Sequence, residues 1–286
     1  MTMGEERYRL LMACPDERGL IHRVSGVLAQ AGANIVAFDQ HSEGLGGHFF
    51  MRSEFDARTG TDARIRKDME SLSRNVPMQW RLTKAHQRQR LAVLVSRESH
   101  CLQELAWQTG RGDIDADIAV VISNHAEIGE LAQSYSLPFY YVPVAKGQKS
   151  ESERQILDIV ANYQIDTIVL ARYMQILSAD FVSRFPSRII NIHHSFLPAF
   201  VGANPYLQAY RRGVKLIGGT AHYVTEELDQ GPIIEQDVHR VDHRHQLADY
   251  KRIGRHVERM VLARAVNWHV SDRVLPFENR TIVFPI

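Results

Sequence analysis

The sequence predicts an α/β protein of two domains: an N-terminal ferredoxin-like domain with the order βαββαβ, then a domain built on a doubly wound, mostly parallel sheet. The first observation is length, since 286 residues correspond to about two domains at roughly 150 residues each. The second is a change of pattern near residue 90, after which short apolar strands alternate with amphipathic helices. The stretch 85–90 between them is polar and has no periodicity. We therefore predict domains at 1–84 and 91–286, joined by a linker at 85–90.

The elements of the first domain follow from short local patterns. Residues 7–14 form an apolar run typical of a strand, and Asp16–Ala31 repeats apolar residues at helical spacing. Gly32 follows at the position where a helix commonly ends on a residue that tolerates positive φ. The remaining predicted elements are strands at 34–43 and 48–56, a helix at 61–75 and a strand at 78–84. This order predicts a four-stranded antiparallel sheet with both helices on one face.

The second domain is predicted from apolar strands separated by amphipathic helices, the pattern of a sheet covered on both faces. Ser150 and Glu153 have the spacing of a capping box at the start of one helix. Residues 273–284 are predicted to close the domain as a hairpin. The strands are predicted at 91–96, 118–123, 139–143, 167–171, 188–192, 216–224 and 232–238, and the helices at 100–109, 126–135, 151–163, 178–184 and 246–269.

Composition narrows the classes of function. The chain has 34 basic and 33 acidic residues, a balance that argues against a nucleic-acid binder with a strong basic field. Cys14 and Cys101 belong to no CxxC pattern, so neither a disulfide framework nor a zinc knuckle is expected. No apolar run approaches the ~18 residues of a membrane-spanning helix, and the N-terminal run is too short for a signal peptide. We expect a soluble, cytoplasmic protein without nucleic-acid or membrane partners.

Candidate catalytic residues follow the predicted strand 188–192. In an open α/β sheet ligands bind at the carboxyl ends of the strands, and Asn191 and His193 share one face of this extended segment. An amide beside an imidazole suits acyl chemistry, because both can hydrogen-bond a developing oxyanion. Asp229, in the polar loop between the next two strands, brings a carboxylate to the same crevice. From spacing alone we would favour structural roles, in which Asn191 and His193 cap the strand and Asp229 is a turn residue.

Two long motifs resolve this ambiguity by resemblance. The segments NIHHSFLPAFVGANP (191–205) and GGTAHYVTEELDQGPII (218–234) resemble the folate-dependent formyltransferase fold family. The resemblance implies that Asn191, His193 and Asp229 are catalytic. It also implies a folate pocket that takes Met174, Gln175, Ile176 and Leu177 from one segment and Val224 and Thr225 from another.

The N-terminal domain, with its Gly32-Ala33-Asn34-Ile35 turn, resembles an ACT domain. That resemblance implies a homo-oligomer and an amino-acid effector, such as glycine or methionine, held at Gly32, Ala33, Asn34 and Ile35. The alternative is a domain that serves oligomerisation alone.

An ACT-like domain before this catalytic domain resembles the hydrolytic members of the family, which convert 10-formyltetrahydrofolate to formate and tetrahydrofolate for the one-carbon supply of purine biosynthesis. The residues agree: the turn after the first strand of the second domain, Ser96–His100, contains no glycine, whereas a phosphate-bearing acceptor is typically cradled by a glycine-rich turn. Water is therefore the expected acceptor. A folate is then the substrate, and no cofactor and no metal are expected.

Three alternatives remain at this level. The first is transfer of the formyl group to an amine acceptor. The second is a non-catalytic amino-acid sensor, against which the Asn191, His193 and Asp229 set argues. The third is a metal site in the run His239, His243 and His245, with Asp237 and Asp242 nearby. The chain has 14 histidines, an abundance that suggests this alternative. We favour solvated or core histidines there.

Overall fold

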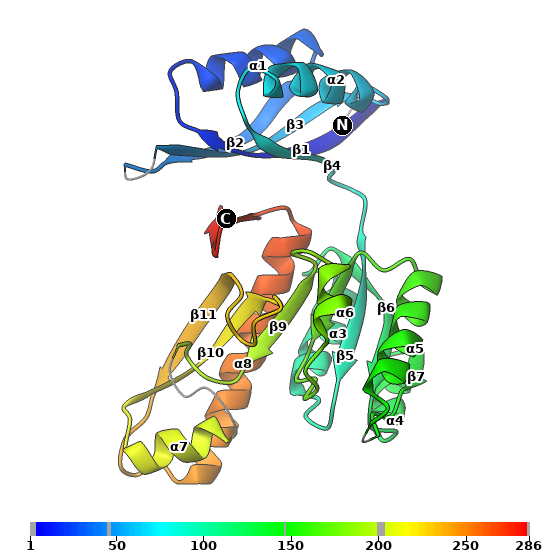
Figure 1. Cartoon of the computed structure of the whole chain (residues 1–286), viewed down its shortest axis with the longest axis vertical. Helices are drawn as coiled ribbons and strands as arrows, with labels where there is room; N and C mark the ends of the chain where they lie inside the picture. Colours follow the sequence, from blue (N-terminus) through cyan, green and yellow to red (C-terminus); the bar gives the residue numbers. More distant parts are fainter. Residues whose placement is uncertain (1–3, 45–46, 146, 199–203, 285–286) are drawn as a thin grey trace. The chain divides into compact units, whose positions relative to one another are not determined.

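The computed structural model describes residues 4–44, 47–145, 147–198 and 204–284. It divides into two compact units (Figure 1). The first comprises the described residues within 1–88, 271–277 and 282–286, and the second those within 89–270 and 278–281. The break after residue 88 lies inside the linker predicted at 85–90. The C-terminal segment differs from our expectation, because most of it belongs with the first unit.

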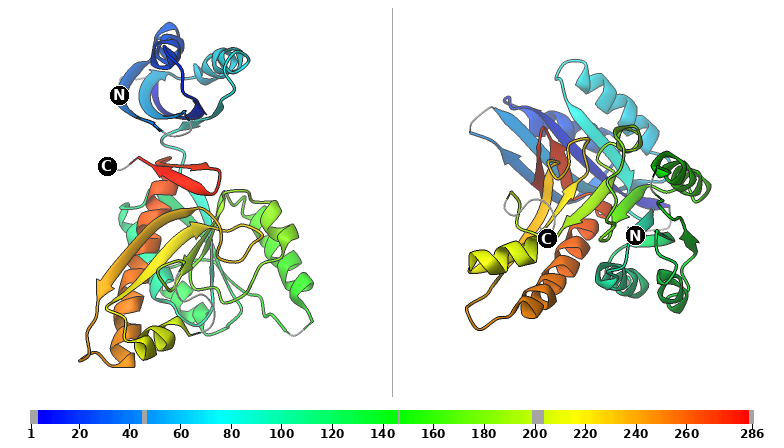
Figure 2. Two further views of the ribbon diagram at one scale, coloured as in Figure 1. Left: turned by 60° about the vertical axis from the view of Figure 1, so that its left-hand side comes forward. Right: turned by 60° about the horizontal axis from the view of Figure 1, so that its bottom comes forward.

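The first unit contains a four-stranded antiparallel sheet in the order β2-β3-β1-β4. Helices α1 and α2 lie together on one face of this sheet (Figure 2). Leu10 and Met12 of β1 pack there against Leu28 of α1 and Ile65 of α2, all fully buried. The elements are β1 (Glu5–Pro15), α1 (Leu20–Gln30), β2 (Asn34–Ser42), β3 (His48–Arg58), α2 (Asp62–Ser73) and β4 (Gln79–Lys84). The predicted βαββαβ order is confirmed.

The opposite face of this sheet is covered by the C-terminal hairpin, β12 (Val274–Phe277) and β13 (Arg280–Val283). Leu11 and Phe50 of the sheet pack against Leu275 and Phe284 in one buried cluster. Strand β1 alternates between two apolar faces, so both must be covered. An uninterrupted apolar run such as YRLLMACP is typical of a strand buried on both sides.

The second unit contains a seven-stranded sheet in the order β11-β10-β9-β8-β5-β6-β7. Five neighbours, β9-β8-β5-β6-β7, are parallel, and β10 runs antiparallel to β9 and β11. The chain reverses its direction of winding between β5 and β8, so the switch point lies there. The strands are β5 (Gln89–Val95), β6 (Ala116–Ser123), β7 (Phe139–Tyr141), β8 (Thr167–Leu170), β9 (Ile189–His193), β10 (Leu216–Tyr223) and β11 (Ile233–Arg240). The doubly wound, mostly parallel sheet is confirmed.

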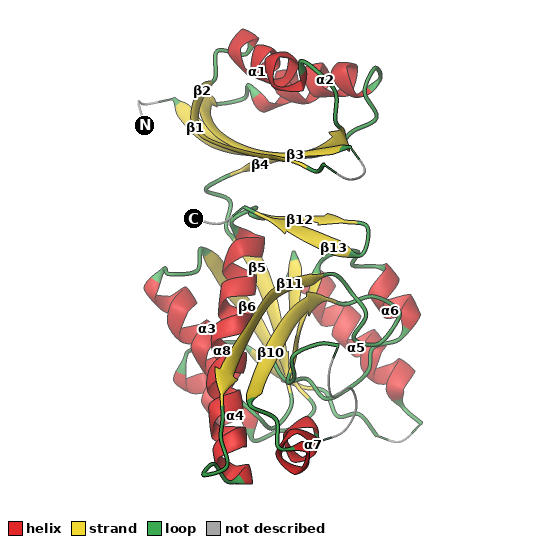
Figure 3. Ribbon diagram, turned by 90° about the vertical axis from the view of Figure 1, so that its left-hand side faces the viewer, coloured by secondary structure: helices red, strands yellow, loops and turns green. Residues whose placement is uncertain are grey.

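Helices cover both faces of this sheet (Figure 3). Leu94 of β5 and Ile189 of β9 pack against Ile156 of α5 and Phe181 of α6 in one buried cluster. Helix α8 packs against α3 and against β9, β10 and β11, on the other face. The helices are α3 (His100–Arg111), α4 (Ile128–Ser134), α5 (Lys149–Asn162), α6 (Ala179–Ser183), α7 (Pro205–Arg212) and α8 (Leu247–Val270).

Two local expectations were wrong or incomplete. No side chain caps α5, which already includes Ser150; the carboxylate of Glu153 instead accepts from the backbone N–H and hydroxyl of Ser178, the N-cap of α6. Helix α7 was not predicted at all. Its start at Pro205 and its stop at Gly213, which has φ +67°, are the ordinary signals of a short helix.

Within the described residues, no helix has the length and hydropathy needed to cross a membrane. Cys14 and Cys101 are both buried and unpaired by disulfide.

Candidate active site

Strands β9 and β10 bring four polar side chains together. The antiparallel register sets Asn191 opposite His222 and His193 opposite Thr220, and directly opposed residues project to the same face. His193 and His222 are buried, at 6% and 2% exposure. Thr220 shapes the turn that follows His193, because its hydroxyl donates to the Ser195 carbonyl and accepts from the Leu197 N–H. The predicted pair Asn191 and His193 therefore lies at the end of a strand whose following turn is held in place by hydrogen bonds.

Asp229 reaches this pair from the loop between β10 and β11. Its Oδ2 lies 3.3 Å from Nδ1 of His193, and its Oδ1 lies 3.7 Å from Nε2 of His222. Asp229 has φ +56°, a left-handed conformation that aspartate tolerates better than most residues. The structure thus brings together all three residues that the sequence singled out.

Hydrogen bonding orients His222 and, through it, Asn191. Nδ1 of His222 lies 2.9 Å from the Tyr223 carbonyl, which can only accept, so Nδ1 carries the proton. In the neutral ring Nε2 then accepts from Nδ2 of Asn191, 3.1 Å away. This fixes the amide of Asn191 and leaves its second N–H without a partner in the described part of the chain.

The imidazole of His193 is oriented in the same way. Its Nδ1–H faces the Asp229 carboxylate, and its Nε2 is buried with no hydrogen-bond partner among the described residues. The facing Nδ1–H of His193 is the main group that holds the pKa of Asp229 well below its usual range, against the opposing effect of burial. Asp229 is therefore a carboxylate at neutral pH, and it faces the Nδ1 side of the His193 ring.

Gly231 makes the Asp229 loop possible. A Cβ at this position would lie 1.8 Å from the Tyr223 carbonyl oxygen and 2.9 Å from its carbon, and backbone atoms cannot step aside.

We expect Gly231→Ala to lower the free energy of unfolding by about 1–3 kcal/mol and to cut turnover, because the loop that carries Asp229 must shift. Thermal unfolding and steady-state rates measure both effects. Gly110→Ala is the matched control, since a Cβ there meets nothing within 4 Å. Equal behaviour of the two variants would contradict the steric argument.

The predicted folate residues lie on two neighbouring segments. Leu177 and Val224 pack against the same buried cluster between the sheet and α5. Met174 and Ile176 are 58% and 62% exposed, an unusual state for two apolar side chains so close in the chain. The backbone N–H of Met174 donates to Ser96 Oγ at the end of β5.

The other two predicted folate residues, Gln175 and Thr225, are partly buried. The Thr225 hydroxyl donates to the Glu227 carbonyl, so it helps to shape the loop that ends at Asp229.

The predicted effector turn lies at the end of α1. Gly32 has φ +72°, and the N–H groups of Gly32 and Ala33 already donate to carbonyls of the last helical turn. Asn34 and Ile35 open β2 and are exposed. An effector at this turn would therefore meet the side chain of Asn34 rather than free amides of the helix end.

The histidine run 239–245 does not assemble as a metal site in the described part of the chain. Asp237 pairs with Arg264, and Asp242 pairs with Arg244 and His245. Across the described residues, one group of three potential ligands has its ligand atoms within 4.8 Å of one another, namely His100, Cys101 and Glu258. His100 Nε2 already lies 2.9 Å from Glu258 Oε2.

Comparison with known proteins identifies the class. Residues 89–266 match the Formyl transferase family, and residues 8–69 match the ACT domain family. Fold and site together thus define a formyltransferase-type catalytic domain behind an ACT domain. Formyltetrahydrofolate deformylase of Bacillus subtilis is 52% identical over 284 residues, which cover 98% of this chain and 95% of that protein. The chain belongs to the formyltetrahydrofolate deformylase family.

Solved structures agree with this membership. A formyltetrahydrofolate deformylase from Pseudomonas syringae pv. tomato matches with TM-score 0.93 at 45% identity, over 99% of this chain and 96% of that chain. Glycinamide ribonucleotide transformylase 1 from Symbiobacterium toebii matches with TM-score 0.66 at 30% identity, over 70% of this chain and 95% of that chain. The predicted resemblance is confirmed.

His222 is the residue that the sequence argument missed. It lies inside the quoted motif GGTAHYV, but only the pairing of β9 with β10 places it opposite Asn191. The available signal was its even spacing from Thr220 on a predicted strand, which puts it on a defined face without saying what that face meets.

Proposed function

We propose that this chain hydrolyses 10-formyltetrahydrofolate to formate and tetrahydrofolate, with Asn191, His193 and Asp229 as its catalytic residues. The supporting observation is the buried Nε2 of His193, which has no described partner, beside an Asn191 amide that His222 holds in place. Family membership supports the substrate. Asp229, whose Oδ2 lies 3.3 Å from Nδ1 of His193, places a negative charge on the side of the ring away from Nε2.

The reaction proceeds by addition and elimination. The oxygen of water forms a bond to the formyl carbon, and the carbonyl electron pair moves onto oxygen. Asn191 Nδ2–H and His193 Nε2–H donate to this oxyanion, an arrangement in which one donor is typically worth about 10²–10³-fold in rate. Asp229 accepts a proton of the attacking water. The bond from carbon to N10 then breaks, and N10 takes up the proton held by Asp229, relayed through solvent, so that the carboxylate is restored.

The folate would occupy the side of the sheet that carries Leu177 and Val224. The exposed side chains of Met174 and Ile176 offer an apolar surface to the planar pterin ring, and Gln175 and the backbone at Thr225 offer polar groups to its edge. Burial of apolar surface supplies roughly 25 cal/mol per Å². Such a pocket explains why two large apolar residues remain exposed in the free protein.

The decisive experiment incubates the purified chain with 10-formyltetrahydrofolate and water alone. We expect equal amounts of formate and tetrahydrofolate to form. Mass spectrometry and absorbance measure the two products. The alternative transferase function predicts no turnover until an amine is added. If the protein binds the folate but releases no formate, the hydrolase assignment is wrong.

No metal or cofactor takes part in this proposal. We expect extensive dialysis against a chelator to leave the rate of formate release within about twofold, because the donors at the site, Asn191 and His193, act by hydrogen bonding. Loss of activity that returns with one added divalent ion would contradict this expectation.

We further propose that the ACT unit binds an amino acid, such as glycine or methionine, near Asn34, and that the protein acts as a homo-oligomer. The match of residues 8–69 to the ACT family supports the class of effector. Titration of glycine and methionine against the rate of formate release tests the effector. A flat response to both amino acids would discard it, and light scattering tests the oligomer.

A further inference from the structure

The two faces of the seven-stranded sheet pack against different helices next to the active site. Asn191 and His193 alternate with Ile190 and Ile192 along β9, so they share a face with Ile189, which packs towards α5 and α6. Leu177 and Val224 belong to that same side. A folate held there leaves the opposite side, towards α3 and α8, as the direction from which an acceptor would approach its formyl group.

That opposite side is filled by a buried ionic cluster, consisting of His100, Arg172, Tyr206 and Glu258. Glu258 of α8 is fully buried. Its carboxylate accepts from His100 Nε2 at 2.9 Å and from the hydroxyl of Tyr206, and it lies 3.4 Å from Arg172 Nε. Burial acts to raise the pKa of Glu258, but the bond from His100 and the charge of Arg172 prevail and lower it. The cluster thus surrounds one buried carboxylate with the Arg172 guanidinium and with hydrogen bonds to His100 and Tyr206.

Ring contacts connect this cluster to the catalytic histidine. The rings of His193 and His194 are 5.4 Å apart, and those of His194 and Tyr206 are 6.0 Å apart. Tyr206 is seated against α8 at Gly254, where a Cβ would lie 2.0 Å from its hydroxyl oxygen. No bulkier residue at that position would allow Tyr206 to reach Glu258.

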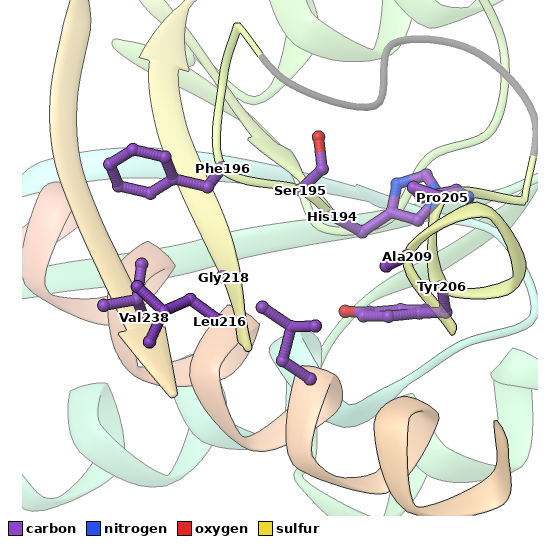
Figure 4. A pocket seen from close by; sticks show the side chains of 10 residues that line it. His194, Ser195, Phe196, Pro205, Tyr206, Ala209, Leu216, Gly218 and Val238 are labelled. Atoms are coloured by element: carbon purple, nitrogen blue, oxygen red, sulfur yellow. The ribbon is translucent and has the colours of Figure 1, made fainter. Parts of the chain in front are cut away.

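Two hollows flank the cluster, and neither is lined by a catalytic residue. The first, of about 260 Å³, is mostly apolar, and His194 and Tyr206 line one end of it (Figure 4). The second, of about 560 Å³, is lined almost entirely by cationic and histidine side chains, including His100 and Arg255. Asn191, His193 and Asp229 line neither hollow.

We propose that the His100, Arg172, Tyr206 and Glu258 cluster determines acceptor specificity: it closes the α3 and α8 side of the active site to amines and so leaves water as the formyl acceptor. This proposal rests on the proposed hydrolysis. Tyr206 is the principal barrier, since its ring packs on that of His194, which in turn packs on the ring of His193. Glu258, His100 and Arg172 hold the Tyr206 ring in place.

The competing reaction shows what the cluster prevents. An amine nitrogen would add to the formyl carbon, the bond from carbon to N10 would break, and the proton lost by the amine would pass to N10. The products would be a formamide and tetrahydrofolate, with no formate. Hydrolysis and transfer therefore differ only in the nucleophile, and their ratio can be measured in one assay.

The test measures products from 10-formyltetrahydrofolate in the presence of hydroxylamine, a small amine nucleophile. For the unchanged protein we expect formate. For Tyr206→Ala we expect the ratio of formylhydroxamate to formate to rise at least tenfold, whereas Tyr206→Phe, which keeps the ring, should stay close to the unchanged protein. Tyr210→Ala is the matched control, because Tyr210 lies on the same helix and is 38% exposed.

The outcomes separate this proposal from the hydrolase assignment. Failure of the unchanged protein to release formate without an amine would overturn the hydrolase assignment itself. Formylhydroxamate from the unchanged protein at the level of Tyr206→Ala would overturn the role of the cluster alone. Formate alone from Tyr206→Ala would do the same. If Tyr206→Ala does not fold, Tyr206→Leu, which fills more of the space left by the ring, takes its place under the same criteria.

Discussion

Replacement of Asp229 by asparagine is expected to lower kcat by about 10³–10⁴-fold, the effect typical of removing the carboxylate that orients a catalytic imidazole. Asparagine has nearly the same shape, so folate affinity should stay within a few-fold. The loss has two causes, because the amide places no negative charge beside the His193 ring, 3.3 Å away, and cannot accept a proton from water. Single-turnover formate release and tetrahydrofolate binding measure the two quantities separately.

Glu227→Gln is the control for this substitution, since Glu227 is an exposed carboxylate in the same loop. A general effect of lost charge would slow both variants alike and would remove Asp229 from the mechanism.

The pH dependence of stability gives a second check on Asp229. The depressed pKa of Asp229 in the folded state means that its ionisation stabilises the fold above the unfolded pKa, about 3.9. This contribution disappears as pH falls through the folded pKa, so the stability difference between Asp229→Asn and the unchanged protein should shrink below about pH 4.

Replacement of His193 by alanine is expected to lower kcat by about 10²–10⁴-fold, the range for a lost proton donor or acceptor in a transition state. Its Nε2 is the buried nitrogen for which the described chain supplies no partner, so its removal should affect the reacting group more than the fold. Folate affinity should change little, because the proposed pocket residues are untouched. Rates with and without added imidazole test the assignment, since imidazole can enter the space left by the side chain.

His243→Ala provides the contrast, because His243 is exposed. We expect its rate to match that of the unchanged protein. If His193→Ala retains more than about a tenth of the activity, His193 does not stabilise the oxyanion, and Asn191 alone has that role.

The sequence was most informative where a pattern is local. The βαββαβ order, the alternation of apolar strands and helices, and the polar segments after two strands could all be read from periodicity and spacing. Asn191 and His193 were found because adjacent alternating positions share a face, and Asp229 because its loop leaves the neighbouring strand. The resemblance of the two motifs then decided between catalytic and structural roles for these three residues.

Features that depend on long-range pairing could not be read in the same way. His222 acquires its role from the register of β9 against β10, and no pattern within β10 states which strand lies beside it. The ionic cluster likewise joins α3, the end of β8, α7 and α8, separated by up to 158 positions between His100 and Glu258. A buried carboxylate is expected to have partners, but the sequence does not say where they come from.

The C-terminal hairpin has a practical consequence for dissecting this protein. The chain leaves the first unit near Arg88 and re-enters it at Ser271, so a protease that cuts within residues 85–90 does not release that unit. A fragment ending at residue 84 would leave Leu11 and Phe50 without the apolar cover of Leu275 and Phe284. A fragment of 91–286 would contain Leu275 and Phe284 without the sheet against which they pack. A first unit that folds alone therefore calls for a rearranged gene, in which codons 271–284 are joined by a short linker to codons 4–88.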